Sequence, residues 1–230
     1  MTHRVHPYIF RLGINTTWKS RWFNAKKYQE YLREDTLVRE WLTKKLRQAH
    51  IDAIDIERSP TAMNVIIRTA KPGILIGRGG EGAERLKQEI QKKLRQIASK
   101  EVKLEKRDLK LTVEEVKSPE THAAIVAQMV ADELEKRIPF RRVLKQMIEK
   151  VIQSKGVEGV KIAISGRLDG SEMARYEWLK KGRIPLQTLR AHIDYAHKEA
   201  YTKYGVIGVK VWIYKGETFD NKSEARNPKS

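Results

Sequence analysis

The chain has 230 residues, a formal net charge of +18 and 33% charged residues, so much of its surface must be ionic. It has no cysteine, which excludes disulfides and thiolate zinc sites. No apolar run approaches the ~20 residues of a membrane-spanning helix or resembles the core of a signal peptide, so we expect a cytoplasmic protein without a membrane partner. The length suits two modest domains, and the positive excess favours a polyanionic partner, with nucleic acid as the leading candidate.

The first 35 or so residues show no clean periodicity and interleave basic residues with aromatics, most clearly in Trp18-Lys19 and Arg21-Trp22-Phe23. Such a segment can hold phosphates while its rings stack on bases. The alternative is an extended arm whose aromatics anchor it to the first domain. The two interpretations are compatible, and both stay open.

The next segment has the element order of an RNA-binding domain. A helix is predicted from Asp35-Thr36, a plausible N-cap, to about Gln48. Strands are predicted at 53–57, 64–69 and 109–114. Between the last two strands lie a short apolar run, a Gly-x-x-Gly turn and an amphipathic helix with apolar residues at Ala83, Leu86, Ile90, Leu94 and Ile97. Helix, strand, strand, short helix, GxxG, helix and strand is the order of a type II KH domain.

The GxxG turn is Gly77-Arg78-Gly79-Gly80. Glycine has no Cβ, so a polyanion backbone can approach the main chain closely. Arg78 adds a cation, and the following helix offers its positive N-terminal end. GxxG loops of KH domains clamp about four nucleotides of single-stranded nucleic acid. We therefore predict that these four residues bind RNA.

A nucleotide-dependent enzyme is the alternative, because Gly77 to Gly82 formally fits G-x-G-x-x-G. The dinucleotide fold needs a full strand before the glycines, and only Ile74–Ile76 are available. Glu101 and Glu105 precede the next strand instead of ending it. No nucleophile–His–acid pattern occurs, and none of the six histidines has a convincing metal spacing to a carboxylate. We therefore predict no catalytic residue, no cofactor, no metal and no small-molecule substrate.

The second half predicts two helices followed by four strands. The first helix starts near Ser118-Pro119 and ends near Arg137, before Ile138-Pro139. The second spans 140–153 with a buried stripe at Val143, Leu144, Met147, Ile148 and Val151. Strands are predicted at 160–165, 174–179, 189–195 and 206–214, followed by a polar tail after Gly216 that we expect to be frayed. The fold class is therefore α+β, with the helices on one face of an antiparallel sheet.

Two groups of basic residues stand out in this half. Arg141, Arg142 and Lys145 lie opposite the apolar stripe of their helix, at spacings that make them neighbours. A second group follows the strands and consists of Arg167, Arg175, Lys180, Lys181, Arg183 and Arg190. On charge alone the first group is most simply a solvated helix face, although the clustering of like charges without acidic neighbours argues for a polyanion nearby. Which strand residues share a face cannot be fixed from the sequence.

Several independent motifs make the resemblance to one family close. They include Ser165-Gly166-Arg167-Leu168, Glu177-Trp178, Gly182-Arg183, Pro185-Leu186, Thr188-Leu189-Arg190-Ala191, Ile193-Asp194-Tyr195 and the run from Tyr204 to Ile213. Val5-His6-Pro7, Arg11-Leu12-Gly13-Ile14 and the segment from Pro72 to Gly80 extend it to the first half. The chain resembles the bacterial small-subunit ribosomal protein family uS3, nearly throughout and up to about Gly216. Tyr176 stands where that family usually has threonine, and the segment 92–110 is longer and more charged than expected.

This resemblance implies a structural protein of the small-subunit head that binds ribosomal RNA and neighbouring head proteins. It implies an N-terminal arm at 1–16, a type II KH domain with a three-stranded sheet at 17–117, a C-terminal domain at 118–215 and a tail at 216–230. Phe140 to Lys145 resembles the family segment that contacts incoming messenger RNA in its entrance channel, so Arg141, Arg142 and Lys145 would face the messenger. Other candidate ribosomal RNA contacts are Arg4, Arg11, Lys19, Arg167, Arg175, Arg183 and Arg190. The alternative is a free-standing KH regulator that acts on messengers outside the ribosome.

Overall fold

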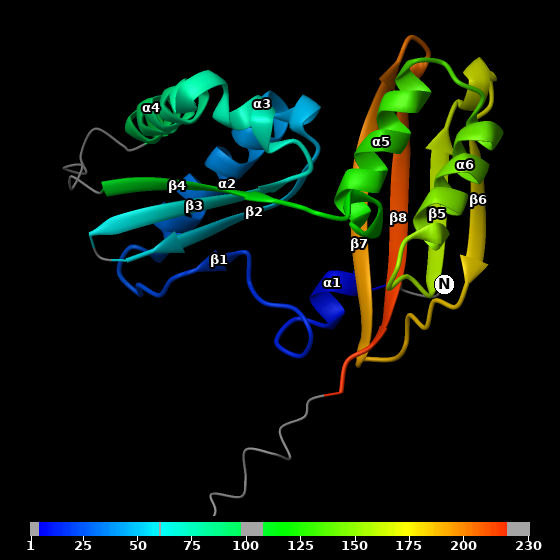
Figure 1. Ribbon diagram of the computed structural model, residues 1–230, viewed down its shortest axis with the longest axis horizontal. Coiled ribbons are helices and arrows are strands. Elements are labelled where there is room, and N and C mark those ends of the chain that lie inside the picture. The colour runs from blue at the N-terminus through cyan, green and yellow to red at the C-terminus, as the bar shows by residue number, and fades with distance from the viewer. Residues whose placement is uncertain (1–4, 60, 98–107, 220–230) are drawn as a thin grey trace, which may run out of the picture. The chain divides into compact units, whose positions relative to one another are not determined.

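The computed structural model describes residues 5–59, 61–97 and 108–219. The chain is α+β, as predicted, and forms two compact units (Figure 1). One unit comprises Trp18–Met129, and the other combines Met1–Thr17 with Val130–Ser230. The N-terminal segment is therefore divided: residues up to Thr17 belong with the C-terminal unit, whereas Trp22 packs against Tyr31 in the N-terminal unit, as the anchoring alternative expected. In the part of the chain that the structure describes, no helix has the length and apolarity needed to cross a membrane.

The N-terminal unit is a mixed sheet with helices. Its strands are β1 (Ser20–Arg21), β2 (Ile51–Arg58), β3 (Ala62–Thr69) and β4 (Asp108–Glu115), in the order β1-β2-β3-β4. β2 and β3 are antiparallel, whereas β4 runs parallel to β3 and β1 runs parallel to β2. The elements β2 to β4 are those predicted for the KH domain. The short edge strand β1 was not predicted, because two residues are too few for a periodic pattern.

The core of this unit contains residues from two long helices and the sheet. The helices are α2 (Tyr28–Lys45) and α4 (Glu81–Ile97). Val38 and Leu42 of α2 and Leu86 and Ile90 of α4 are buried in one cluster with strand residues such as Ile56. The predicted apolar stripe of α4 is therefore the face that packs, and its charged face stays outside.

The predicted start of α2 was wrong. Asp35 is not an N-cap, since the helix begins at Tyr28 and Asp35 lies within it, fully buried. Its carboxylate accepts hydrogen bonds from the guanidinium of Arg58 on β2 and from Trp22 Nε1 at 2.8 Å. The buried stripe of α2 thus includes a charged residue, which a search for apolar periodicity cannot find.

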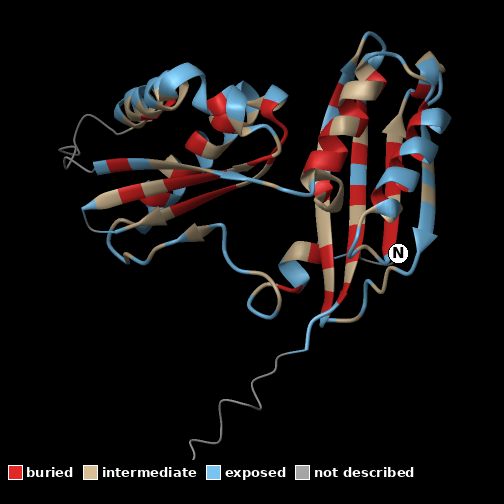
Figure 2. Cartoon of the chain, in the orientation of Figure 1, coloured by how far each residue is buried: buried red, intermediate tan, exposed pale blue. Residues whose placement is uncertain are grey.

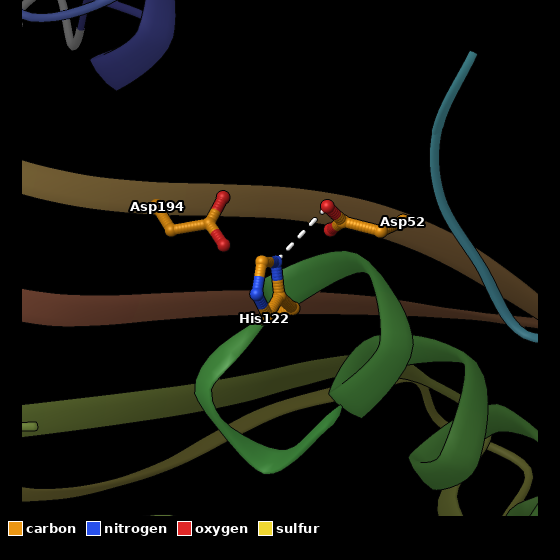
Figure 3. Close-up of side chains that lie close together, drawn as sticks. All are labelled: Asp52, His122 and Asp194. Carbon is orange, nitrogen blue, oxygen red and sulfur yellow. Dashed lines mark ion pairs between the residues drawn. The ribbon is translucent and has the colours of Figure 1, made fainter. Parts of the chain in front are cut away.

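A second polar contact ties the beginning of β2 to the end of the unit. His122 Nδ1 lies 2.9 Å from Asp52 Oδ2, just after the 3-10 turn η3 (Pro119–Thr121) (Figure 3). The predicted helix start at Ser118-Pro119 is this turn, and α5 (Ala123–Glu135) begins after it. The boundary between the two units falls inside α5.

The C-terminal unit is a four-stranded antiparallel sheet, as predicted. Its strands are β5 (Gly159–Gly166), β6 (Arg175–Gly182), β7 (Ala191–Thr202) and β8 (Gly205–Glu217), in the order β6-β5-β8-β7. The helix α6 (Phe140–Gln153) has the predicted bounds and packs on β5 and β6 (Figure 1). Alternate residues of the central strands are buried beneath the helices: Val160, Ile162 and Ile164 on β5, and Val209, Val211 and Ile213 on β8.

Three short segments lie before or between these main elements. The short helix α1 (Pro7–Phe10) lies against β7. The 3-10 turn η4 (Leu168–Gly170) follows β5. The predicted break at Ile138-Pro139 separates α5 from α6, and Arg137 before it adopts a left-handed φ of 60°. The expected frayed tail falls on residues outside the described ones from position 220, and so does most of the long segment 92–110, from 98 to 107.

Candidate nucleic-acid interface

The GxxG turn lies between two helices, as its sequence context predicted. The helix α3 (Pro72–Ile76) ends at Gly77, a 3-10 turn η2 covers Arg78–Gly80, and α4 begins at Glu81. Gly77, Gly79 and Gly80 have φ values of 68°, 64° and 85°. Other L residues adopt such values only at a cost, so the turn requires glycine at these positions for conformational reasons.

Glycine is required at position 82 by the packing of two helices and not by a cofactor. A Cβ on Gly82 would lie 2.7 Å from the carbonyl oxygen of Leu75 and 2.9 Å from that of Ile76. Gly82 therefore lets the N-terminal turn of α4 contact α3, and this contact fixes the shape of the loop between them. The last glycine of the formal G-x-G-x-x-G match thus has a structural reason within the KH fold.

The surface around the turn is basic and partly apolar. Arg78 and Lys71 are exposed. Ile74 and Ile76 of α3 are 56% and 40% exposed. Exposed aliphatic side chains beside a cationic, glycine-rich turn can contact bases while the turn holds the phosphates. The two isoleucines were not among the predicted RNA contacts, because the sequence alone does not show whether a short apolar run is exposed.

The second candidate surface is the outward face of α6. Arg141, Arg142 and Lys145 are exposed, while Val143, Leu144, Met147, Ile148 and Val151 on the opposite side of the helix are buried. Much of the visible side of α6 is coloured as exposed in Figure 2. Among the described residues, no carboxylate forms an ion pair with any of the three cations. Because these charges are not neutralised within the described parts of the chain, they are available to a polyanion.

The structure brings one cation of the strand group next to this helix. Arg141 and Arg175 line the same hollow, together with Phe140 and Leu168. A neighbouring hollow is lined by Arg167, whose guanidinium carbon lies 5.7 Å from the centre of the Tyr204 ring. The helix group and part of the strand group therefore form one basic region of the C-terminal unit.

Arg11 is not available to RNA, which corrects its prediction as a ribosomal RNA contact. Only 1% of its surface is exposed. Its guanidinium donates to the carbonyl oxygens of Pro7, Pro185, Leu186 and Thr188 at 3.0 to 3.3 Å. Burial lowers the pKa of this group. Arg11 therefore fastens the N-terminal arm to the loop between β6 and β7, because one guanidinium satisfies several carbonyls at once.

The remaining predicted contacts differ in their surroundings. Lys19 and Arg183 are exposed. Arg190 is 60% exposed but pairs with Glu217 at 2.6 Å and lies 5.2 Å from the Phe219 ring centre, so its charge is partly neutralised. Arg4 lies outside the described residues.

Comparison with protein families agrees with this architecture. Residues 37–121 match the family model "KH domain". Residues 130–213 match the family model "Ribosomal protein S3, C-terminal domain". The first match covers the GxxG turn and the second covers α6 and the C-terminal sheet.

Relatives match nearly the full chain. "Small ribosomal subunit protein uS3" of Oleidesulfovibrio alaskensis is 45% identical over 97% of this chain and 100% of its own length. The protein of the same name from Caldicellulosiruptor saccharolyticus is 48% identical over 98% of this chain and 97% of its own length. That from an Anaeromyxobacter species is 45% identical over 100% of this chain and 97% of its own length. These relatives are ribosomal proteins and not enzymes, which agrees with the prediction that this chain is not an enzyme. Since identity is this high over almost the whole length, the chain belongs to the uS3 family of small ribosomal subunit proteins.

Proposed function

We propose that this protein is a structural component of the head of the small ribosomal subunit, where it binds ribosomal RNA and lines the entrance channel of messenger RNA. Its partners are small-subunit ribosomal RNA, messenger RNA and neighbouring head proteins, and its location is the cytoplasmic ribosome. The family assignment supports the ribosomal part of the proposal. The messenger contact rests on the side chains of α6.

The observation that carries the messenger contact is the exposed cluster Arg141, Arg142 and Lys145. Helix spacing places the three side chains on one face of α6. Because the opposite face of the helix is buried, the helix keeps the three side chains in fixed positions relative to one another. Arginine and lysine attract the phosphates of RNA whatever its base sequence. A protein that lines the entrance channel must contact every messenger in this way. The role is electrostatic and needs no nucleotide hydrolysis by this chain.

The second part of the proposal concerns the GxxG turn. Gly77 to Gly80 and the exposed isoleucines of α3 suit a short unpaired stretch of ribosomal RNA, with main-chain donors and Arg78 at the phosphates. We assign Lys19, Arg167, Arg175 and Arg183 to phosphate contacts as well, since they are exposed. Arg190 is a weaker candidate because of its pairing with Glu217.

The triple variant Arg141→Ala/Arg142→Ala/Lys145→Ala tests the messenger contact. We expect it to enter small subunits normally, because the three side chains contribute nothing to the core. Translation of a messenger with a stable hairpin downstream of the start should slow, while an unstructured messenger is translated at nearly the original rate. Lys150→Ala is the matched control, since Lys150 is exposed on the last turn of the same helix. Loss of assembly in the triple variant would show that the cluster holds ribosomal RNA or the fold.

The free-standing regulator makes a different prediction. If the protein acts outside the ribosome, a substantial fraction of it should sediment apart from small subunits in a gradient of cell lysate. We expect nearly all of it to sediment with them.

A further inference from the structure

The face of the C-terminal sheet opposite α6 carries a concentration of aromatic and basic side chains. The strand register puts alternate residues on this face, beginning with Lys161, Ala163 and Ser165 on β5. Their partners on the neighbouring strands include Tyr176, Trp178 and Lys180 on β6, Lys210 and Trp212 on β8, and Tyr195, His197 and Glu199 on β7. We call these residues the open face.

Rings and a cation form a continuous row across the four strands. The rings of Tyr195 and Trp212 have their centres 5.2 Å apart. Lys161 Nζ lies 5.3 Å from the centre of the Trp212 ring and 4.8 Å from that of Trp178. The row therefore runs from β7 through β8 and β5 to β6, with the lysine between two tryptophans.

The two ends of this row have different environments. At the β7 end the centre of the Tyr195 ring lies 4.7 Å from that of the His6 ring, and the neighbouring Trp212 packs against a small cluster of buried residues that includes Ile193 and Tyr214, so this end has a structural role. Trp178 and Tyr176, on the edge strand β6, are each 50% exposed. Ala163 on β5, the register partner of Trp178, is only 1% exposed, so the side chains around it cover this part of the sheet. Large rings held half-exposed on a rigid sheet are a costly arrangement in water unless something flat covers them.

The charges of the face indicate the chemistry of that partner. Lys161, Lys180 and Lys210 lie among the rings. The acidic residue on the same face of the sheet is Glu199. The edge strand β6 also carries Arg175 and Lys181, and charged residues on an edge strand disfavour the addition of a protein strand. A surface of aromatic rings with interspersed cations on a four-stranded sheet suits unpaired nucleotides, whose bases stack while their phosphates meet the cations.

We propose that the open face is a stacking platform for unpaired RNA nucleotides, with Trp178 and Tyr176 as the stacking residues and Lys161, Lys180 and Lys210 as the phosphate contacts. The inference rests on the proposed RNA-binding function and adds a third surface, separate from the GxxG turn and from the outward face of α6. It assigns a base-contacting role to two aromatic side chains that were not among the predicted RNA contacts.

The test uses the purified full-length chain with a labelled single-stranded oligouridylate and, separately, an RNA duplex of the same length. Trp178→Ala/Tyr176→Ala should weaken binding of the single strand about tenfold or more, because stacking on one aromatic ring contributes roughly 1–3 kcal/mol per base. Binding of the duplex, whose bases are already stacked, should stay unchanged. Tyr28→Ala is the control, since Tyr28 is 56% exposed but belongs to the N-terminal unit.

A second measurement needs no variant and so does not depend on folding. Ultraviolet irradiation of assembled small subunits should attach a nucleotide to a peptide that contains Tyr176 or Trp178, identified by mass spectrometry. Equal loss of single-strand and duplex binding, or crosslinks from this peptide to protein alone, would overturn the platform. The α6 triple variant is measured in parallel: if it weakens binding while the aromatic variant does not, the platform fails and the proposed function stands.

Discussion

The buried carboxylate of Asp35 should be one of the most sensitive positions in the N-terminal unit. Its side chain is fully buried and accepts hydrogen bonds from Arg58 and Trp22, while the Arg58 side chain is only 3% exposed. Asp35→Ala would leave the Arg58 cation in the interior with Glu34, at 2.7 Å, as its remaining carboxylate. Removing one partner of a buried ion pair costs about 3–5 kcal/mol. This network joins α2 to β2, the part of the unit on which α4 and the GxxG turn rest.

We therefore expect Asp35→Ala to lower the free energy of unfolding of the N-terminal unit by about 3–5 kcal/mol. The midpoint of its thermal unfolding should fall by roughly 12 to 20 °C. Urea unfolding of the full chain, followed by tryptophan fluorescence and far-ultraviolet circular dichroism, measures this. The transition of the C-terminal unit should stay in place.

A matched control distinguishes a buried pair from a surface pair. Arg21 and Glu57 lie 2.7 Å apart, but each side chain is 42% exposed. Glu57→Gln should therefore cost about 1 kcal/mol or less. If Asp35→Ala costs no more than Glu57→Gln, the network does not support the unit and the reasoning is refuted. Replacing both partners, by Asp35→Leu with Arg58→Met, should recover part of the loss, because the Arg58 cation is then no longer buried without Asp35, although Glu34 loses its pairing with Arg58.

Three further predictions follow from particular contacts. Gly80→Ala should weaken binding of single-stranded RNA by about 5- to 30-fold, since a left-handed φ costs a non-glycine residue about 1–2 kcal/mol; Gly73→Ala, which has open space and an ordinary φ, is the control in the same titration. Arg11→Lys should lower the free energy of unfolding of the C-terminal unit by about 2 kcal/mol or more in urea, because an ammonium cannot reach the carbonyls that the guanidinium satisfies; an effect below about 0.5 kcal/mol would contradict this assignment. Burial raises the pKa of Tyr214, so the folded state favours the neutral phenol, and the stability it contributes is present below about pH 10 and lost as the pH rises through the folded-state pKa. Alkaline unfolding followed by circular dichroism should shift to higher pH in Tyr214→Phe. An unchanged profile would show that ionisation of Tyr214 does not cause the loss of stability at high pH.

Regular, locally encoded features could be predicted from the sequence. The helix α6 has the predicted bounds because its buried stripe and its preceding Ile138-Pro139 break are both local. The positions of the C-terminal strands along the chain and the position of the GxxG turn followed in the same way. The exposure of Arg141, Arg142 and Lys145 also follows from helix periodicity, since a residue opposite an apolar stripe faces outward.

Features that depend on distant partners could not be predicted. Arg11 looked like a phosphate contact because its acceptors, such as the carbonyl of Thr188, lie far away in the sequence. Asp35 looked like a helix cap because aspartate favours that position, but tertiary contact with Arg58 on β2 extends the helix past it. The residues of the open face could not be identified from the sequence. Which residues of different strands share a face is known only when the register between neighbouring strands is known.

The most direct test of the account places a photoreactive amino acid at Gln146, which is exposed on the outward face of α6 beside the three cations. A second variant carries it at Arg78 in the GxxG turn. Both are incorporated into small subunits, which are then loaded with a defined messenger and irradiated. We predict that position 146 crosslinks to messenger downstream of the decoding site and that position 78 crosslinks to ribosomal RNA. Crosslinks from both positions to ribosomal RNA alone would contradict the messenger contact and leave the protein as an assembly scaffold.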